Sequence, residues 1–322
     1  MKKNYSVGIV GATGLIGRKL LQVLIDRRFP FANIKLFASE KSVGKNINDI
    51  EVRKLDENSF VGLDLVFFCA GKEVSLKYVP IAVESGAFVI DNSSAFRQNE
   101  DIPLIIPEIN MNVALKSNSR IIANPNCYTT QAILPLKNLA KKFCIKRIIM
   151  STYQAVSGSG QKGINDLLNT KKGLKGKLYP VNISENYICK IDEQRKNGYT
   201  AEETKALNET RKILGMPVMV SSTCVRVPIK NCHGVTVEVE FSKKIDLDEV
   251  FKIINSTKGI KYTELASPES ADGKYFVYVS RLRKSTAFDN GIAYFTVSDN
   301  TLKGAALNAV QIAERLVKNG KI

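Results

Sequence analysis

A cysteine in the segment ANPNCYTTQ has the surroundings of a nucleophile. Cys127 follows a turn formed by Pro125 and Asn126, and it precedes a predicted helix that begins near Thr129. The dipole at a helix N-terminus favours the thiolate over the thiol. An unperturbed thiol has a pKa of about 8.5, so this effect matters near neutral pH. A buried cysteine that happens to follow a turn would give the same local pattern, and from these residues alone both interpretations stay open.

The chain has one histidine, His233, so any catalysis by an imidazole must use it. On its own, a single histidine is more often a structural residue than a catalytic one. The chain also has six cysteines, which contain no CxxC pair and lack the spacing of zinc ligands. We therefore expect neither a disulfide framework nor a bound metal.

A glycine-rich turn, GATGLIG, lies between the first predicted strand and an amphipathic helix. A dinucleotide site needs a tight turn, close approach of the backbone to a pyrophosphate, and a helix packed near the strand. Glycine removes the side chain at each of these points, and the helix N-terminus attracts the phosphates. The expected cofactor-binding residues of this turn are Gly11, Ala12, Thr13, Gly14, Leu15, Ile16 and Gly17.

The residues at the end of the second predicted strand bear on the choice of coenzyme. An acidic residue there would bind the ribose hydroxyls of NAD, whereas a cation and a hydroxyl would hold the extra phosphate of NADP. Ser39 and Lys41 favour NADP, while Glu40 between them keeps NAD open. We expect NADP, bound with the help of Ser39 and Lys41.

The first part of the chain alternates strands and helices, which indicates a parallel, doubly wound Rossmann-like sheet. The expected strands are 6–10, 33–38, 63–69 and 88–90, and the expected helices are 15–28 and 79–85. After Asn124 the strands become alternating, β-branched or aromatic, as in an α+β domain with a largely antiparallel sheet. The expected strands there are 147–155, 224–229, 234–241, 275–283 and 291–297, and the expected helices are 129–143, 201–214, 247–255 and 302–318.

The domain boundaries follow from this change of pattern. We expect a dinucleotide-binding domain at 1–126, completed by a C-terminal helix at 303–322, and a catalytic and dimerisation domain at 127–302. The stretch 157–181, rich in Gly and Lys, is expected to be a mobile loop.

Composition excludes several classes of protein. The 322 residues are 44% hydrophobic, with no run of about 18 apolar residues and no signal-peptide pattern, so we expect a cytoplasmic protein without a membrane span. The net charge is +16, but the lysines are spread along the chain rather than gathered in one arm. This distribution argues against a nucleic-acid partner and suits an anionic substrate and cofactor.

Several segments, in order from the first strand to the last helix, resemble those of aspartate-semialdehyde dehydrogenases. The segments are GATGLIG, VIDNSSAFR (89–97), ANPNC (123–127), YQAVSGSG (153–160), EETKALNETRKI (202–213), TCVRVP (223–228) and SDNTLKGAALNAVQIAE (298–314). The resemblance implies NADPH-dependent reduction of aspartyl-4-phosphate to aspartate-4-semialdehyde through a cysteine thioester, in lysine/diaminopimelate, threonine and methionine biosynthesis. It also implies a homodimer, with a tetramer left open.

The resemblance implies a role for individual positions. Cys127 would be the nucleophile, His233 the acid/base, and Gln154 would orient the acyl group. The implied substrate-binding residues are Arg97, Asn126, Glu202, Lys205 and Arg226, with Arg226 on the α-carboxylate and Glu202 on the ammonium. Further implied cofactor contacts are Ser157, Gly158 and Asn300.

Two positions depart from the family pattern. Cys232 and Gly234 flank the histidine where Gly-His-Ser is usual, and Tyr128 replaces a small residue after the nucleophile. The tyrosine is shared with the related N-acetyl-γ-glutamyl-phosphate reductases, which remain the alternative. Those enzymes normally have glycine in place of Asn126 and act on a blocked amine, which would leave Glu202 without an ammonium to bind. A catalytically silent nucleotide-binding protein is the alternative from another class.

Overall fold

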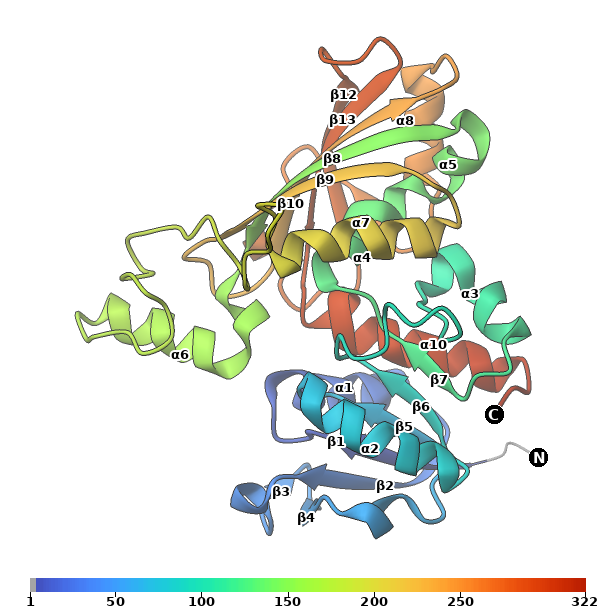
Figure 1. Ribbon diagram of the computed structural model, residues 1–322, viewed down its shortest axis with the longest axis vertical. Helices are drawn as coiled ribbons and strands as arrows, with labels where there is room; N and C mark the ends of the chain where they lie inside the picture. Colours follow the sequence, from blue (N-terminus) through green and yellow to red (C-terminus); the bar gives the residue numbers. More distant parts are fainter. Residues whose placement is uncertain (1–3) are drawn as a thin grey trace. The chain divides into compact units, whose positions relative to one another are not determined.

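The computed structural model describes residues 4–322. The chain divides into two compact units, of which unit 1 contains the chain up to Pro125 together with Ala305–Ile322. Unit 2 comprises Asn126–Gly304. The ribbon of each unit can be followed in Figure 1.

Unit 1 is built on a parallel sheet. Within the described residues the strand order is β3-β4-β2-β1-β5-β6-β7, and β3 alone pairs antiparallel. The strands are β1 (Tyr5–Val10), β2 (Phe31–Ala38), β3 (Asn46–Ile47), β4 (Ile50–Lys54), β5 (Leu65–Phe68), β6 (Phe88–Asp91) and β7 (Ile121–Ala123). The interior strand β5, LVFF, is buried along its whole length, as expected for a parallel strand covered on both faces.

Helices cover both faces of this sheet. They are α1 (Leu15–Asp26), α2 (Lys72–Glu84), α3 (Pro107–Lys116) and α10 (Leu307–Lys318), with short turns η1 (Glu40–Ser42) and η2 (Glu57–Phe60). The crossovers β1-α1-β2 and β5-α2-β6 run in opposite directions, so right-handed connections put α1 and α2 on opposite faces.

The C-terminal helix α10 is bonded into unit 1. It packs against α1 and α3. Asn308 donates hydrogen bonds to the Ile105 carbonyl (2.9 Å) and to Asn124 Oδ1 (2.7 Å), and Arg27 forms a two-bonded ion pair with Glu314. These contacts bond the last helix to residues that lie 184 to 287 positions earlier in the chain.

Unit 2 contains a mixed, largely antiparallel sheet, as predicted. Within the described residues its order is β11-β12-β13-β10-β8-β9, with parallel pairs at β11–β12 and β8–β9. The strands are β8 (Ile145–Gln154), β9 (Met219–Arg226), β10 (His233–Phe241), β11 (Ile260–Tyr262), β12 (Val277–Lys284) and β13 (Gly291–Ser298).

Helices pack against one face of the unit 2 sheet. The helices of unit 2 are α4 (Cys127–Ile133), α5 (Lys137–Phe143), α6 (Gly160–Lys171), α7 (Ala201–Leu214), α8 (Leu247–Asn255) and α9 (Pro268–Ala271), with η3 (Leu134–Leu136), η4 (Val156–Ser159) and the π-turn η5 (Leu302–Ala306). Among them, α6 packs against η4 and projects away from the sheet (Figure 1). Of these, α4 contacts β8, β10 and β13, α7 contacts β9, and α8 contacts β12. On the opposite face, Ile149, Tyr153 and Met219 are exposed.

Several predicted elements need correction. The expected loop at 157–181 is wrong for residues 157–171, which form η4 and α6. The helix expected at 79–85 begins at Lys72, with Pro80 on its exposed side. The strand expected at 224–229 runs from Met219 to Arg226, and the helix expected at 129–143 begins at Cys127 and is interrupted by η3. The last helix begins with the π-turn η5.

The missed elements were short. Strands β3, β4, β7 and β11 and helices α3 and α9 span between 2 and 10 residues. Segments of this length carry too few residues for a period of 2 or 3.6 to stand out from chance.

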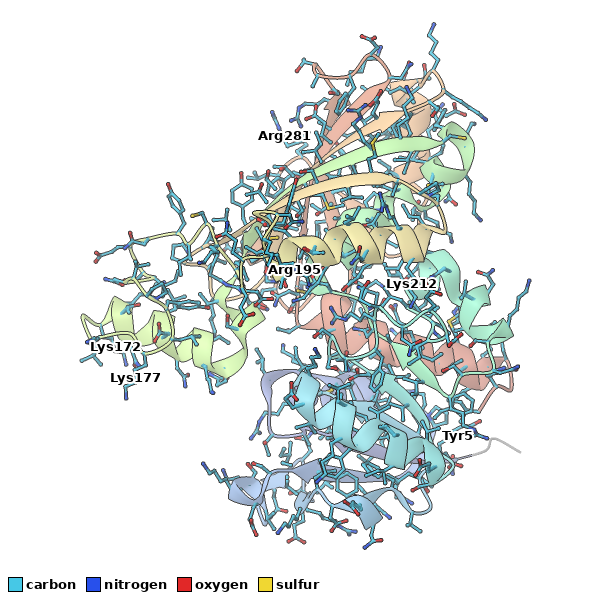
Figure 2. All side chains as sticks on the ribbon, in the orientation of Figure 1. Tyr5, Lys172, Lys177, Arg195, Lys212 and Arg281 are labelled. Atoms are coloured by element: carbon cyan, nitrogen blue, oxygen red, sulfur yellow. The ribbon has the colours of Figure 1, made fainter. Side chains whose placement is uncertain are left out.

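The basic side chains lie at separate places. In unit 2, Lys172 and Lys177 follow α6, Arg195 lies on the loop before α7, and Arg281 lies on β12 (Figure 2). All four are exposed. Among residues 4–322, no helix combines the length and apolar character that crossing a membrane requires.

Candidate active site

The predicted nucleophile lies at the first position of α4. Asn126 is the N-cap of this helix, and its Oδ1 accepts a 3.0 Å hydrogen bond from the Tyr128 N–H. The chain at Gly304 packs directly on the cysteine, because a Cβ added at Gly304 would lie 2.6 Å from Cys127 Cβ. The backbone of Cys127 is therefore fixed from two sides.

Asn126 joins the start of α4 to α7. Its Nδ2 donates a 3.0 Å hydrogen bond to Glu202 Oε1, and its backbone N–H donates a 2.6 Å bond to Glu209 Oε2. Both glutamates are buried. Glu209 carried no signal in the sequence, because its partner is 83 residues away in the chain.

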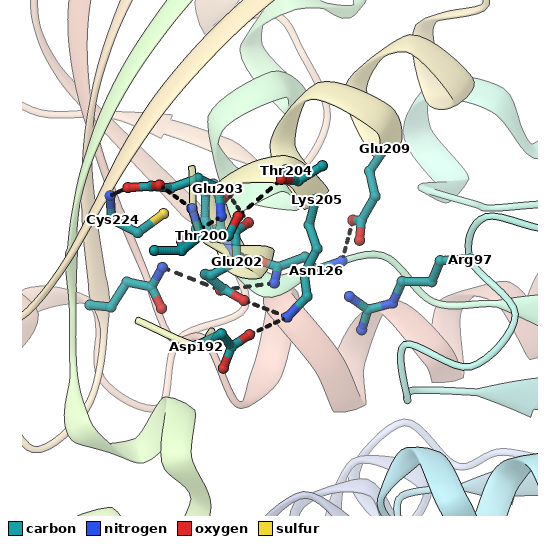
Figure 3. Close-up of polar contacts among 12 residues, drawn as sticks. Arg97, Asn126, Asp192, Thr200, Glu202, Glu203, Thr204, Lys205, Glu209 and Cys224 are labelled. Carbon is teal, nitrogen blue, oxygen red and sulfur yellow. Dashed lines mark hydrogen bonds and ion pairs between the residues drawn. The ribbon is translucent and has the colours of Figure 1, made fainter. Parts of the chain in front are cut away.

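Glu202 is the centre of a buried polar cluster (Figure 3). Besides Asn126, its carboxylate accepts hydrogen bonds from Lys205 Nζ (2.6 Å) and Gln154 Nε2 (3.3 Å). Burial by itself raises the pKa of the Glu202 carboxyl, but the Lys205 ammonium and the hydrogen bonds from Lys205 and Asn126 outweigh it and hold the pKa below its usual range. The side chain is thus an anion at neutral pH.

The first turn of α7 is anchored on both sides. Thr200 and Glu203 form a capping box, which the sequence pattern T-x-x-E predicts but which we did not single out. Glu203 Oε1 also accepts a 3.0 Å bond from the Cys224 N–H on β9. The buried Tyr128 hydroxyl donates to the Glu202 carbonyl (2.9 Å), and burial raises the Tyr128 pKa. Tyr128, the residue after Cys127, is thus bonded to the backbone of Glu202.

Gln154 and Arg226 are register partners at the ends of the parallel strands β8 and β9. Arg226 is buried, and its Nη1 donates to the Ala155 carbonyl (2.7 Å) and lies 3.5 Å from Gln154 Oε1. Gly158 gives the guanidinium its space, since a Cβ there would lie 2.6 Å from Arg226 Nη1. The two strands therefore deliver an amide and a cation to the same place.

His233 begins β10 and is fully buried. Its Nδ1 accepts a 3.0 Å hydrogen bond from the Ala155 N–H, so the proton of the neutral ring sits on Nε2. Burial and the Arg226 charge lower the pKa of His233 to about 3, against an opposing effect of Glu202. Gln131 on α4 donates to the His233 carbonyl (2.9 Å), which bonds the helix that begins at Cys127 to the strand that begins at His233.

Ser157 and Asn300, two predicted cofactor contacts, are buried and bonded to each other within unit 2. Asn300 Oδ1 also accepts a bond from the Cys232 N–H (3.1 Å), and Ser157 Oγ donates to Asn231 Oδ1 (2.8 Å). Cys232 has a positive φ of 72°. These bonds hold the backbone of the residue before His233.

The glycine-rich turn in unit 1 has the geometry that a dinucleotide site requires. Gly11 has φ +79°, and a Cβ at Gly17 would lie 2.3 Å from the Gly11 carbonyl oxygen. Gly14 is the N-cap of α1 and makes no side-chain capping bond, which leaves the helix start open to an anion. Ala12, Thr13, Leu15 and Ile16 complete the turn.

The residues that we predicted to select the coenzyme follow the end of β2. Ser39 is the N-cap of η1, and Glu40 and Lys41 follow it. Glu40 forms a 2.9 Å ion pair with Lys54 on the exposed surface. Both glutamate and lysine of this pair are solvent-accessible, so the pair itself contributes little stability.

The structure brings most of the predicted unit 2 residues together. Direct hydrogen bonds connect Asn126, Gln154, Glu202, Lys205 and Arg226, and Ala155 connects Arg226 to His233. Arg97 belongs to unit 1, where it is buried and donates a 2.9 Å bond to the Asn92 carbonyl.

Two family models match the chain in succession. The "Semialdehyde dehydrogenase, NAD binding domain" matches residues 6–117, and the "Semialdehyde dehydrogenase, dimerisation domain" matches residues 136–303. The first carries the glycine-rich turn and the second carries Gln154, Glu202 and His233. The chain therefore contains an NAD(P)-binding domain and a dimerisation domain.

Full-length relatives carry the same name. The chain is 43% identical to the aspartate-semialdehyde dehydrogenase of Aquifex aeolicus and 40% identical to that of Rickettsia bellii, with 99% of each chain covered. Among solved structures, aspartate semialdehyde dehydrogenase II complexed with ASA from Vibrio cholerae superposes with a TM-score of 0.92 at 40% identity, covering 98% of this chain and 99% of that one. Given these matches over its whole length, the chain belongs to the aspartate-semialdehyde dehydrogenase family.

Proposed function

We propose that the protein reduces aspartyl-4-phosphate to aspartate-4-semialdehyde with NADPH and releases phosphate, with Cys127 carrying the acyl group as a thioester. The observation that carries the proposal is the buried cluster of Gln154, Glu202, Arg226 and His233 in the unit that contains Cys127. This cluster offers an anion, a cation, an amide and an imidazole to one small substrate.

The charges of the cluster match those of the amino acid end of the substrate. Arg226 grips the α-carboxylate, since a guanidinium binds a carboxylate through two parallel hydrogen bonds. Glu202, held ionised by Lys205, receives the α-ammonium. Lys205 is the cation of this cluster that binds the phosphoryl group. Asn126 acts mainly by orienting Glu202, because its own amide is already bonded within unit 2.

The reaction proceeds in two stages on the sulfur. The Cys127 thiolate attacks the acyl carbon, a C–S bond forms, the bond from that carbon to the phosphate oxygen breaks, and phosphate leaves. When bound, NADPH supplies the hydride that reduces the thioester. The C–S bond then breaks, which releases the aldehyde and restores the thiolate. Gln154 orients the acyl group during both stages.

His233 handles charge on the reacting oxygen. The neutral ring carries its proton on Nε2, an atom that is buried and has no hydrogen-bond partner among residues 4–322. A donor of this kind stabilises the oxyanion that forms at each tetrahedral stage. In the proposed mechanism the ring donates this hydrogen bond without losing its proton, because the alkoxide formed by reduction of the thioester collapses directly to aldehyde and thiolate.

The cofactor we propose is NADP, bound by residues 1–126 with the C-terminal helix 303–322, while 127–302 supplies catalysis and dimerisation. The pyrophosphate would lie against residues 11–17, where glycine leaves a cradle that a Cβ would fill. Ser39 and Lys41 would hold the 2′-phosphate, and the pairing of Glu40 with Lys54 leaves that carboxylate less available to a ribose hydroxyl. Ser157, Gly158 and Asn300 would line the nicotinamide end.

We further propose a homodimer that forms through the sheet of unit 2. On the side of this sheet opposite α4 and α7, the paired strands present exposed apolar side chains at Ile149, Tyr153 and Met219. An open sheet face with large apolar residues is a candidate interface. Sedimentation of the purified protein should give the mass of two chains.

A phosphate-dependent assay tests the proposed reaction. Aspartate-4-semialdehyde, NADP and inorganic phosphate should give NADPH, and omission of phosphate should stop the reaction. N-acetyl-glutamate-5-semialdehyde is run in parallel, and NAD replaces NADP in a third arm. Preferential turnover of the acetylated aldehyde would assign the protein to the reductases that act on a blocked amine.

A further inference from the structure

A loop carboxylate shares the ammonium of Lys205 with Glu202. Asp192 Oδ2 lies 2.8 Å from Lys205 Nζ, and Glu202 Oε2 lies 2.6 Å from the same nitrogen (Figure 3). Sequence reasoning did not single out Asp192. It lies 13 residues before Lys205, in a segment without regular secondary structure.

The segment that carries Asp192 is held on both sides of it. Ile188 exchanges two backbone hydrogen bonds with Arg226 (2.9 and 2.8 Å), and the Glu193 carbonyl accepts a 2.8 Å bond from the Ala201 N–H. Ile191 is buried beside it. Asp192 itself has φ +63°, a conformation that aspartate and asparagine tolerate better than most residues. The fold therefore places this carboxylate between the Arg226 strand and the Lys205 helix.

The two carboxylates on Lys205 are held unequally. Glu202 is buried and accepts further bonds from Asn126 and Gln154. The Asp192 side chain is 46% exposed and faces a hollow of about 570 Å³ that Lys190, Asp192, Glu193 and Ala201 line. An ion pair with such exposure contributes only about 0.2–1 kcal/mol. Asp192 can thus rotate away from Lys205 while the backbone of the segment stays bonded.

We propose that Asp192 is a resident counterion of Lys205, which the phosphoryl group of the substrate, or inorganic phosphate in the reverse reaction, displaces on binding. This inference rests on the proposed function, in which Lys205 binds phosphate. A phosphoryl group carries a charge of about −1.5 to −2 near neutral pH, whereas Asp192 carries −1. The phosphoryl group therefore competes successfully for the ammonium, and Asp192 sets how much phosphate is needed.

Removing the Asp192 charge tests the proposal. Asp192→Asn and Asp192→Gly both suit the positive φ, and both should lower the KM for inorganic phosphate about two- to fivefold in the reverse reaction, the fold-change that an exposed ion pair can supply. The KM for NADP should stay unchanged. Glu193→Gln is the matched control, because it removes the same charge one residue further along the chain.

The outcomes separate this inference from the function on which it rests. In a Lys205→Met background, Asp192→Asn should no longer change the KM for phosphate, and Lys205→Met alone should raise that KM. An unchanged or higher KM in the Asp192 variants, with Lys205→Met still raising it, would overturn the counterion role alone. A Lys205→Met enzyme with an ordinary KM for phosphate would instead remove Lys205 from the phosphate site. An equal decrease in Glu193→Gln would attribute the effect to general charge and also overturn the role of Asp192.

Discussion

The backbone N–H of Ala155 donates a 3.0 Å hydrogen bond to Nδ1 of His233 and thereby fixes the form of the ring. Because Nδ1 accepts this hydrogen bond, it carries no proton. In an imidazolium ring, the Nδ1–H would point at the N–H of Ala155 and the hydrogen bond would be lost. His233 is therefore a neutral donor through Nε2, a role that agrees with a pKa lowered to about 3 by burial and by Arg226.

The protonation of His233 can be observed directly, because it is the chain's single histidine. NMR of the ring nitrogens should show the Nε2–H form, with no titration between pH 8 and pH 5. A resonance that titrates near pH 6.5 in the folded protein would contradict the assigned tautomer and burial.

The same lowered pKa makes folding stability depend on pH. In the unfolded chain the ring takes up a proton below its unperturbed pKa of about 6.5, whereas the folded protein does so only near 3. The unfolded state therefore binds more protons in this window, and the free energy of unfolding falls as the pH decreases. From pH 7 to pH 5 the His233 contribution should fall by about 2 kcal/mol. In His233→Asn, the free energy of unfolding measured in urea should fall correspondingly less between pH 7 and pH 5.

Replacing the nucleophile should separate binding from chemistry. Cys127→Ala should abolish turnover, because no thioester can form, while binding of NADPH measured by fluorescence stays near the wild-type value. Cys232→Ala, which removes the thiol of the residue before His233, is the control and should keep measurable activity. Residual turnover in Cys127→Ala, above the level of a no-enzyme blank, would contradict the thioester route.

A methyl group at Gly304 should disturb the nucleophile without touching the substrate. In Gly304→Ala the new carbon would lie 2.6 Å from Cys127 Cβ and 2.9 Å from its Cα, so the start of α4 must shift. We expect kcat to fall about 100-fold or more, because small misplacements of a reacting group have such costs. Gly71→Ala is the control, since an added Cβ there meets no atom within 4 Å. Equal activities of the two variants would refute the packing of Gly304 on Cys127.

Loss of the Glu202 charge should weaken recognition of the ammonium. Glu202→Gln keeps the shape but removes the anion, and kcat/KM for aspartate-4-semialdehyde should fall about 10- to 100-fold, the cost of one charged hydrogen bond. The KM for NADP should change little. An aldehyde substrate without the amino group should be turned over equally well by both enzymes, and a large loss with that substrate would indicate a structural role for Glu202.

The coenzyme preference should reside partly in Lys41. Lys41→Ala should raise the KM for NADP while leaving the KM for NAD unchanged, because only NADP carries the additional phosphate. Lys54→Ala, which removes the partner of Glu40, should shift the balance toward NAD by releasing that carboxylate. Equal effects of Lys41→Ala on both coenzymes would point to general electrostatic attraction instead.

Local sequence patterns determined the elements that form from neighbouring residues. The glycine spacing of residues 11–17, the helix at 201–214 and the alternating strands of unit 2 could be predicted because turn chemistry and hydrophobic periodicity act over a few residues. The same reasoning failed where tertiary packing overrides local preference. The Gly- and Lys-rich stretch after Ser157 forms η4 and α6, and Cys127 begins its helix two residues earlier than expected.

The sequence by itself determined which residue types were available for the chemistry: one imidazole, one cysteine after an Asn-containing turn, and the acid and lysine of EETK. Only the tertiary structure decided their states. Ala155 sets the tautomer of His233 from 78 residues away, and Asn126 orients Glu202 from 76 residues away. Asp192 gives Lys205 a second counterion from a loop without any sequence signature. A hydrogen bond or an ion pair depends on distance in space and on burial, and neither quantity can be read from the order of residues along a chain.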